Sequence, residues 1–165
     1  MPTAIRVPDI WFGVSIAAYQ NEDPACVLGA ADCFQTDWDI AVAAGRIPSA
    51  KGDGTFAFSQ TERDIAALKS LGVSHYRLGV EWARVEPRPG VFNDVAIAHY
   101  ANLCRRLREE GIEPVVCLWH WTFPDWLTNL DEPALHGWLH PDAAAHWAQY
   151  VQRITAAVSP HCDLF

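Results

Sequence analysis

A pattern of glycine, apolar segment and tryptophan occurs twice along this chain. Gly72 precedes an apolar segment that runs to Trp82, and Gly111 precedes another that runs to Trp121, so the two units are offset by 39 residues. Each glycine ends a segment with helical spacing of apolar residues. The repeat predicts successive βα units, each with a tryptophan just past the carboxyl end of its strand. Because βα crossovers are right-handed, the strands should form a parallel sheet.

The rest of the chain predicts three strands that alternate with three helices. The expected strands are apolar segments at residues 11–18, 74–80 and 115–119. The expected helices follow a capping box at Ser59–Glu62, an N-cap at Asn93 or Asp94, and Pro141 at a first helical position. Residues 21–58 are rich in Gly, Pro and Asp, and they are too long for a plain connection. This stretch is therefore either functional or locally structured.

The length of the chain limits how much of a closed fold these units can build. An eight-unit barrel needs about 250 residues, whereas this chain has 165. The expected fold class is α/β: one domain over residues 1–165 that forms a partial (β/α)₈ TIM barrel of about three βα units. Periodicity alone leaves an open doubly wound sheet as the alternative. No glycine-rich phosphate-binding motif follows any strand, which disfavours a nucleotide-binding version of that sheet.

Charge and hydropathy exclude several classes of partner. The chain has 12 Lys and Arg against 20 Asp and Glu, a formal charge of −8, and no basic cluster longer than Arg105-Arg106. A nucleic-acid partner is therefore not expected. The clearest apolar run, Val115–Trp119, is far shorter than the roughly 18 residues of a membrane span, and the first residues lack a signal-peptide stretch. We expect a soluble protein without a membrane partner.

Cysteine and histidine spacing predicts neither a disulfide framework nor a metal site. The five cysteines are Cys26, Cys33, Cys104, Cys117 and Cys162. They are scattered, odd in number and without a C-x-x-C motif, which favours reduced thiols and a cytoplasmic location. His136 and His140 are four residues apart, but Gly137 and Pro141 beside them disfavour a rigid helical metal pair. No cofactor is expected.

Polar side chains lie at or near the expected strand ends, where ligands of parallel α/β proteins gather. Gln20 follows the first strand and can donate and accept hydrogen bonds to adjacent sugar hydroxyls, although it could also merely end the strand. Arg77 in the second strand needs an anionic partner, either structural or catalytic. Glu81 fits a salt bridge better than acid–base catalysis. His120 after the third strand is either a satisfied core residue or a ligand for hydroxyls.

The chain contains eight tryptophans, and several of them cluster with His and Asp at residues 119–126. Core packing explains part of this number. Flat aromatic rings also suit the apolar C–H faces of sugars. A carbohydrate site at the strand ends is therefore a hypothesis from the residues alone.

Several ordered motifs resemble glycoside hydrolase family 1, the β-glucosidase family. They are Gly13-Val-Ser-Ile-Ala-Ala-Tyr-Gln20-Asn-Glu22, Tyr76-Arg77 through Trp82-x-Arg84-x-x-Pro87, Gly111-Ile-Glu-Pro114 and His120-Trp121-x-x-Pro124. The resemblance runs from about Trp11 to the chain end. It implies a (β/α)₈ barrel that hydrolyses β-glycosides with retention, and Cys162–Phe165 resembles the start of strand four.

The resemblance also implies roles for individual residues. Gln20, His120 and Trp121 would bind the non-reducing sugar, and Arg77 would lie beside the nucleophile. Thr122 stands where the family usually has Asp. Two further departures are Asp23 after Glu22, where Gly is common, and Thr55–Ser59, which lacks the usual His-Tyr pattern. These differences indicate a divergent branch and leave the sugar preference open.

Retaining hydrolysis needs two carboxyl groups about 5–5.5 Å apart, and the family places both beyond the matched motifs. Asp131-Glu132-Pro133 imitates the acid/base motif but follows a loop, and Asn21-Glu22-Asp23-Pro24 contains an extra Asp. We therefore expect no catalytic carboxylate in this chain and no hydrolysis by it alone. The alternatives are a non-catalytic sugar-binding or oligomer-forming partial barrel, which self-associates through open sheet edges, and another barrel hydrolase with a similar rim.

Overall fold

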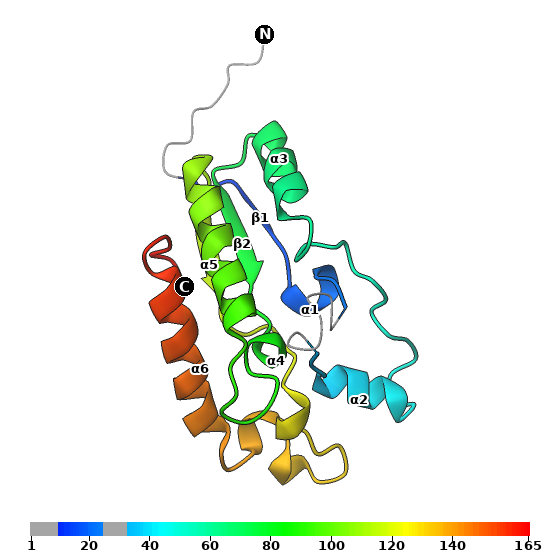
Figure 1. Ribbon diagram of the computed structural model, residues 1–165. Coiled ribbons are helices and arrows are strands. Elements are labelled where there is room, and N and C mark those ends of the chain that lie inside the picture. Colours follow the sequence, from blue (N-terminus) through cyan, green and yellow to red (C-terminus); the bar gives the residue numbers. More distant parts are fainter. Residues whose placement is uncertain (1–9, 25–32) are drawn as a thin grey trace.

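The computed structural model describes residues 10–24 and 33–165. Three parallel strands form one sheet in the order β1 (Gly13–Ser15), β2 (His75–Gly79) and β3 (Glu113–Cys117). The α-helices are α1 (Ala18–Asn21), α2 (Asp37–Ala43), α3 (Thr61–Leu71), α4 (Trp82–Val85), α5 (Asp94–Glu109) and α6 (Ala143–Val158). Short 3₁₀ helices are η2 (Asp125–Leu127), η3 (Pro133–Leu135) and η4 (Gly137–Leu139). Figure 1 shows this arrangement.

The register of the sheet agrees with the repeat in the sequence. His75 pairs with Gly13 on one side and with Glu113 on the other. The chain end extends the series, because Leu164 makes a parallel bridge to Val115 and its carbonyl accepts a hydrogen bond from the Val116 amide at 2.9 Å. The chain therefore forms the first three βα units and the start of a fourth strand, and the barrel is not closed.

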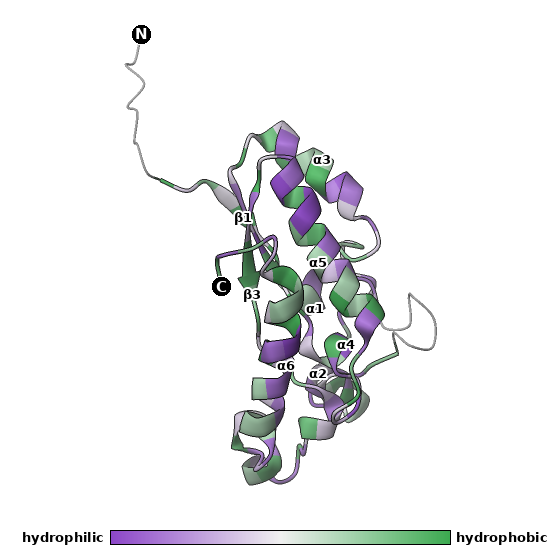
Figure 2. Cartoon of the chain, turned by 60° about the vertical axis from the view of Figure 1, so that its left-hand side comes forward, coloured by the Kyte–Doolittle hydropathy of each residue, from purple (hydrophilic) through white to green (hydrophobic). Residues whose placement is uncertain are grey.

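Helices α3, α5 and α6 pack on one face of the sheet, with α5 between the other two (Figure 1). Their buried side chains meet the inward-facing strand residues in one core, which includes Leu68, Tyr76, Leu78, Tyr100, Leu107, Val116, Tyr150 and Ile154. In the view coloured by hydropathy, the strands lie at one side of the molecule (Figure 2). Since strand side chains alternate between faces, Ser15, Arg77 and Cys117 project to the opposite face and are less buried. The described helices α3, α5 and α6 therefore cover one face of the sheet, and the side chains on the other face are less buried.

The first strand is much shorter than residues 11–18 and is not buried. The ladder covers Gly13–Ser15, and the chain turns into α1 at Ala18. Trp11 and Phe12 precede this ladder and are exposed, although the Trp11 ring stacks on the His75 ring.

Helix ends confirm some local predictions and contradict others. Asn93 caps α5 by accepting from the Ala96 amide, and Gly72 ends α3 with a left-handed φ of 68°. The Ser59–Glu62 capping box does not form, because Ser59 instead donates to the Asp23 carboxylate through both its amide and its hydroxyl. Pro141 precedes α6 rather than opening it.

The stretch of residues 21–58 is locally structured in its described part. Thr36 and Asp39 form a reciprocal capping box at the start of α2. The Phe123 carbonyl accepts from the Asp37 amide at 2.9 Å, so α2 is attached to the segment after β3.

The cysteines differ from the sequence expectation at one position. Cys33 is disulfide-bonded, whereas Cys104, Cys117 and Cys162 carry free thiols. Cys26 lies outside the described residues. The expectation of reduced thiols is wrong at Cys33, and the cytoplasmic location stays a prediction. Within residues 10–24 and 33–165, no helix is long and apolar enough to cross a membrane. In the same ranges, no group of three His, Cys, Asp or Glu side chains could hold a metal ion.

Candidate functional site

The site predicted from the sequence lies at the carboxyl ends of the three strands. Arg77 projects from β2, and His120 follows β3. Partial burial and the nearby Arg77 guanidinium both lower the pKa of His120. Gln20 belongs to α1 rather than following β1 directly, and its side chain is exposed.

Trp121 has an unusual backbone conformation for a large side chain. Its φ is 74°, in the left-handed region that non-glycine residues rarely adopt. Such a conformation costs about 1–3 kcal/mol and persists only where the surroundings hold it. The Trp121 ring stacks on His120 with centroids 5.1 Å apart and is 56% exposed. We call the segment His120–Phe123 the β3 loop.

A pocket of about 260 Å³ lies beside Gln20, between α1 and α2. It is lined by Tyr19, Gln20, Trp38, Val42, Ile47, Ser49, Ala50 and Lys51. The Trp38 ring lies 5.9 Å from that of Trp121, centroid to centroid. Trp38 therefore lies next to both Gln20 and Trp121, and the Arg77 guanidinium lies near His120.

Trp38 is a candidate site residue that the sequence reasoning missed. The Thr36–Asp39 capping box could have located a helix start in the long stretch before α3. It could not have shown that Trp38 meets Trp121, because that contact joins segments more than 80 residues apart in the sequence.

The rim side chains have unused hydrogen-bonding capacity. The side-chain amide of Gln20 and the imidazole ring of His120 make no hydrogen bond to any other residue of the described ranges. Arg77 donates to the Ser15 hydroxyl at 3.1 Å and contacts the Cys117 sulfur at 2.7 Å. No carboxylate in the described part of the chain forms a salt bridge with Arg77, so the expected anionic partner is absent there.

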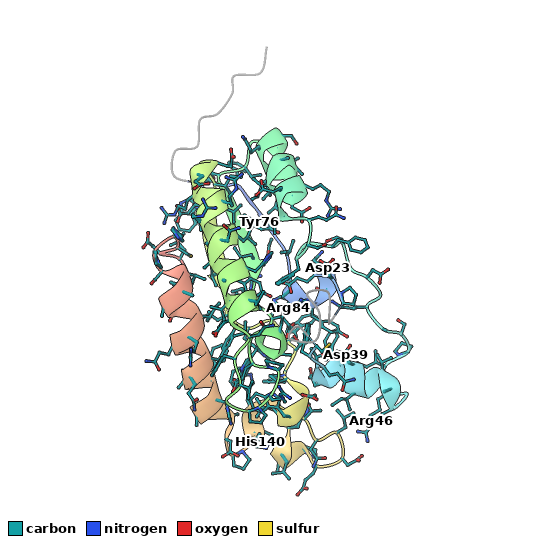
Figure 3. All side chains as sticks on the ribbon, viewed as in Figure 1. Asp23, Asp39, Arg46, Tyr76, Arg84 and His140 are labelled. Carbon is teal, nitrogen blue, oxygen red and sulfur yellow. The ribbon has the colours of Figure 1, made fainter. Side chains whose placement is uncertain are left out.

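The fully buried guanidinium belongs to Arg84 instead. Its Nε lies 3.2 Å from the Glu22 carboxylate, and an Nη donates to the Asp23 carbonyl at 2.8 Å. Figure 3 labels Arg84 and Asp23. The guanidinium also stacks over the Phe58 ring, 4.0 Å from its centroid. Tyr100 donates its hydroxyl hydrogen to Glu22 at 2.8 Å. This network joins α1, α4 and α5 beneath the rim.

Glu81 does not form the predicted salt bridge within the described residues. It is 3% exposed, and its carboxyl group accepts from the Ala83 amide at 3.2 Å and lies 2.9 Å from the Thr122 hydroxyl. Burial, reinforced by the nearby Glu22 charge, raises the pKa of Glu81 to about 8. This contact gives a physical reason for the departure at Thr122, because an Asp there would bring a second carboxylate against Glu81.

The sequence profile of Glycosyl hydrolase family 1 matches residues 6–162. The chain belongs to this family. The match covers nearly the whole chain and includes all three strands and the rim residues. The resemblance drawn from the motifs is thereby confirmed at the level of the family.

Individual relatives of this family-1 chain show the same relationship. It is 31% identical over 153 residues to Myrosinase 1 of Brevicoryne brassicae, covering 87% of this chain and 31% of that protein. It is 40% identical over 98 residues to human Klotho, covering 58% of this chain and 9% of Klotho. A β-glucosidase from Humicola insolens, solved in complex with glucose, superposes with a TM-score of 0.79 and 31% identity.

The family-1 chain spans only part of these relatives. It covers 33% of the Humicola insolens enzyme, while that match includes 95% of this chain. The shared part is the amino-terminal portion of a TIM barrel. The activity of the whole relatives therefore does not transfer directly to this chain.

Proposed function

We propose that this chain binds the non-reducing sugar of a β-glycoside through Gln20, His120 and Trp121, with Arg77 beside them. The observation that carries the proposal is the unused hydrogen-bonding capacity of Gln20 and His120 next to an exposed Trp121 ring. Sugars need donors and acceptors for their hydroxyls and an apolar face for their C–H groups. Membership of Glycosyl hydrolase family 1 supports the choice of a β-glycoside.

We further propose that the chain alone does not hydrolyse the bound glycoside. Retaining hydrolysis requires two carboxyl groups that both reach the substrate. Glu22 and Glu81 are buried, and their carboxyl groups are engaged with Arg84 and Tyr100 and with Thr122 and Ala83, respectively. The segment Asp131-Glu132-Pro133, which imitates the acid/base motif, is exposed and lies in the loop around η3. These placements argue against a catalytic role for any of them.

Sugar binding is tested by titrating the purified chain with methyl β-D-glucoside and methyl β-D-galactoside in a calorimeter. We expect weak binding that Gln20→Ala or His120→Ala each reduces about two- to tenfold, because one hydrogen bond contributes roughly 0.5–1.5 kcal/mol. Gln152→Ala on the exposed face of α6 is the matched control and should bind like the wild type. Equal affinities for all four proteins would refute the proposed site.

The absence of hydrolysis is tested with chromogenic β-glucosides and β-galactosides. We expect no release of the chromophore above the buffer rate. Turnover that disappears in Glu22→Gln or Glu81→Gln would show that a buried carboxylate is catalytic after all, and that half of the proposal would then be wrong.

The second candidate function is a self-associating partial barrel, and one observation supports it. Ile10, Trp11 and Phe12 are exposed beside β1, at an edge of the described sheet. Exposed apolar side chains next to an edge strand favour association with another chain. Sedimentation velocity at several concentrations should detect oligomers that Trp11→Lys with Phe12→Lys converts to monomer. A wild-type chain that stays monomeric at all concentrations would contradict this candidate.

A further inference from the structure

Two free thiols lie side by side in the core, where α5 meets the segment that follows α6. Cys104 belongs to α5 and Cys162 to that segment, and the two residues are 0% and 1% exposed. Their side chains hydrogen-bond to each other. Direct contact is the first requirement for a disulfide, which cannot bridge Cα atoms more than about 7 Å apart.

A second set of contacts holds the same two segments together. Arg108 lies one turn after Cys104 on α5. Its guanidinium donates to the His161 carbonyl at 3.0 Å and to the Asp163 carboxylate at 2.8 Å, so it contacts the residues on both sides of Cys162. The neighbouring position of the two cysteines is therefore supported by the polar contacts around them and not by the thiols alone.

The segment that carries Cys162 is well suited to local opening. Its link to the sheet is the Leu164 carbonyl, which accepts from the Val116 amide at 2.9 Å. Asp163 and Phe165 on either side of that carbonyl are exposed. Short segments with few buried contacts open far more often than the core does. Cys162 can therefore reach solvent when this segment opens, whereas the cysteine on α5 stays inside its helix.

We propose that Cys104 and Cys162 form an oxidative modification site, which exchanges with low-molecular-weight disulfides and then ties the segment after α6 covalently to α5. While the segment is open, the Cys162 thiolate attacks one sulfur of the external disulfide, forms a mixed disulfide and releases one thiolate. When the segment closes, Cys104 loses its proton and its sulfur attacks that of Cys162, which releases the second thiolate. Two electrons pass from the cysteine pair to the external disulfide, and the two released thiolates take up the two protons.

Another free thiol, that of Cys117, provides an internal comparison. Cys117 projects to the opposite face of the sheet just before the β3 loop, and its sulfur contacts the Arg77 guanidinium at 2.7 Å. It is more exposed than Cys104 and Cys162. Oxidation governed by exposure would therefore modify Cys117 first. A bond between Cys104 and Cys162 is expected only if their proximity decides the reaction.

The test equilibrates the purified chain with mixtures of glutathione and glutathione disulfide at pH 8 without denaturant. Acid quenching, alkylation with N-ethylmaleimide and digestion precede mass spectrometry, which identifies each modified or linked cysteine. We expect Cys104 and Cys162 to lose their alkylation together as the proportion of glutathione disulfide rises, and a peptide that links them to appear in the same proportion. The disulfide at Cys33 is followed separately through its own peptides.

A second readout is the melting temperature. A bond between residues 104 and 162 restricts the unfolded chain over the long loop that it closes, so the melting temperature should rise by about 5–15 °C. Cys104→Ala and Cys162→Ala should each lose both the linked peptide and this rise. Cys117→Ser is the matched control, because it removes a thiol outside the pair, and it should keep both.

The wild type alone decides the outcome if either alanine variant folds poorly. Loss of alkylation at Cys117 while Cys104 and Cys162 remain alkylated would overturn the proposal. A linked peptide that joins either of the two to a different cysteine would overturn it as well, as would a bond that forms only in urea or only between two chains. None of these measurements involves sugar, so this inference and the proposed function stand or fail separately.

Discussion

The segments that follow β2 and β3 occupy equivalent places in the repeat and have opposite environments. Trp82 and Trp121 are 39 residues apart at matching positions, yet Trp82 is 1% exposed and Trp121 is 56% exposed. After β2 the chain enters α4 at once, and the Trp82 ring packs among the rings of Trp126, Trp147 and Tyr150. After β3 no helix forms before η2 at Asp125, and Trp121 remains at the rim.

The difference shows that the sequence repeat determines where each tryptophan lies along the backbone, but not whether its side chain is buried or exposed. A helix that starts directly after the strand turns the tryptophan inward. A loop leaves it facing solvent, where it is available to a ligand. Stability should therefore depend on the segment after β2, and binding on the segment after β3.

The largest expected effect is on the free energy of unfolding, when Trp82 and Trp121 are each replaced by alanine. Trp82→Ala should lower the free energy of unfolding by about 3–5 kcal/mol, because it leaves a cavity and removes the indole donor 2.9 Å from Glu86. Trp121→Ala should change it by no more than about 0.5 kcal/mol. Urea denaturation followed by circular dichroism measures both, and similar losses in the two variants would break the comparison.

The next largest effect, again on the free energy of unfolding, comes from replacing Arg84 and Arg77. Arg84→Gln leaves Glu22 buried without its cation and should cost about 3 kcal/mol. Arg77→Gln should cost less than about 1 kcal/mol, because Arg77 has only the Ser15 and Cys117 contacts within the described residues. The same urea experiment applies, and a larger loss for Arg77→Gln would mean that the rim guanidinium is structural.

The smallest effect is on sugar affinity. Trp121→Ala should weaken binding of methyl β-D-glucoside about two- to tenfold, since a stacking contact is worth roughly 0.5–1.5 kcal/mol. Trp82→Phe, which keeps an aromatic ring in the core, should leave the affinity unchanged. A loss in Trp82→Phe that equals the loss in Trp121→Ala would place the second tryptophan in the binding site too.

Much of the fold could be predicted from local sequence. The Asn93 cap, the apolar stripe of α5 and the left-handed Gly72 are local features, and the structure contains all three. Predictions that assumed local partners failed where distant ones competed. Ser59 binds Asp23 rather than its own helix, and Glu62 pairs with Arg106. The first strand is likewise shorter than its mostly apolar sequence predicts, because the chain turns into α1 at Ala18.

The candidate site shows the same division between local features, which the sequence predicts, and contacts with distant segments, which it does not. Gln20, Arg77 and His120 were predicted because the strand ends of a parallel sheet share one rim, and their roles stay a prediction. The surroundings of Glu81 were not predicted, because its carboxyl group accepts a hydrogen bond from Thr122, 41 residues away, and because burial and the nearby Glu22 charge raise its pKa. Trp38 was missed for the same reason.

The sequence by itself determined the family, the parallel order of the strands and the residues at their ends, since periodicity and motifs act over a few residues. Only the tertiary structure decided which tryptophan is buried, which arginine is paired with a buried carboxylate and which carboxyl group has a raised pKa. Burial and charge state depend on every group within a few ångströms, and those groups come from segments far apart along the chain.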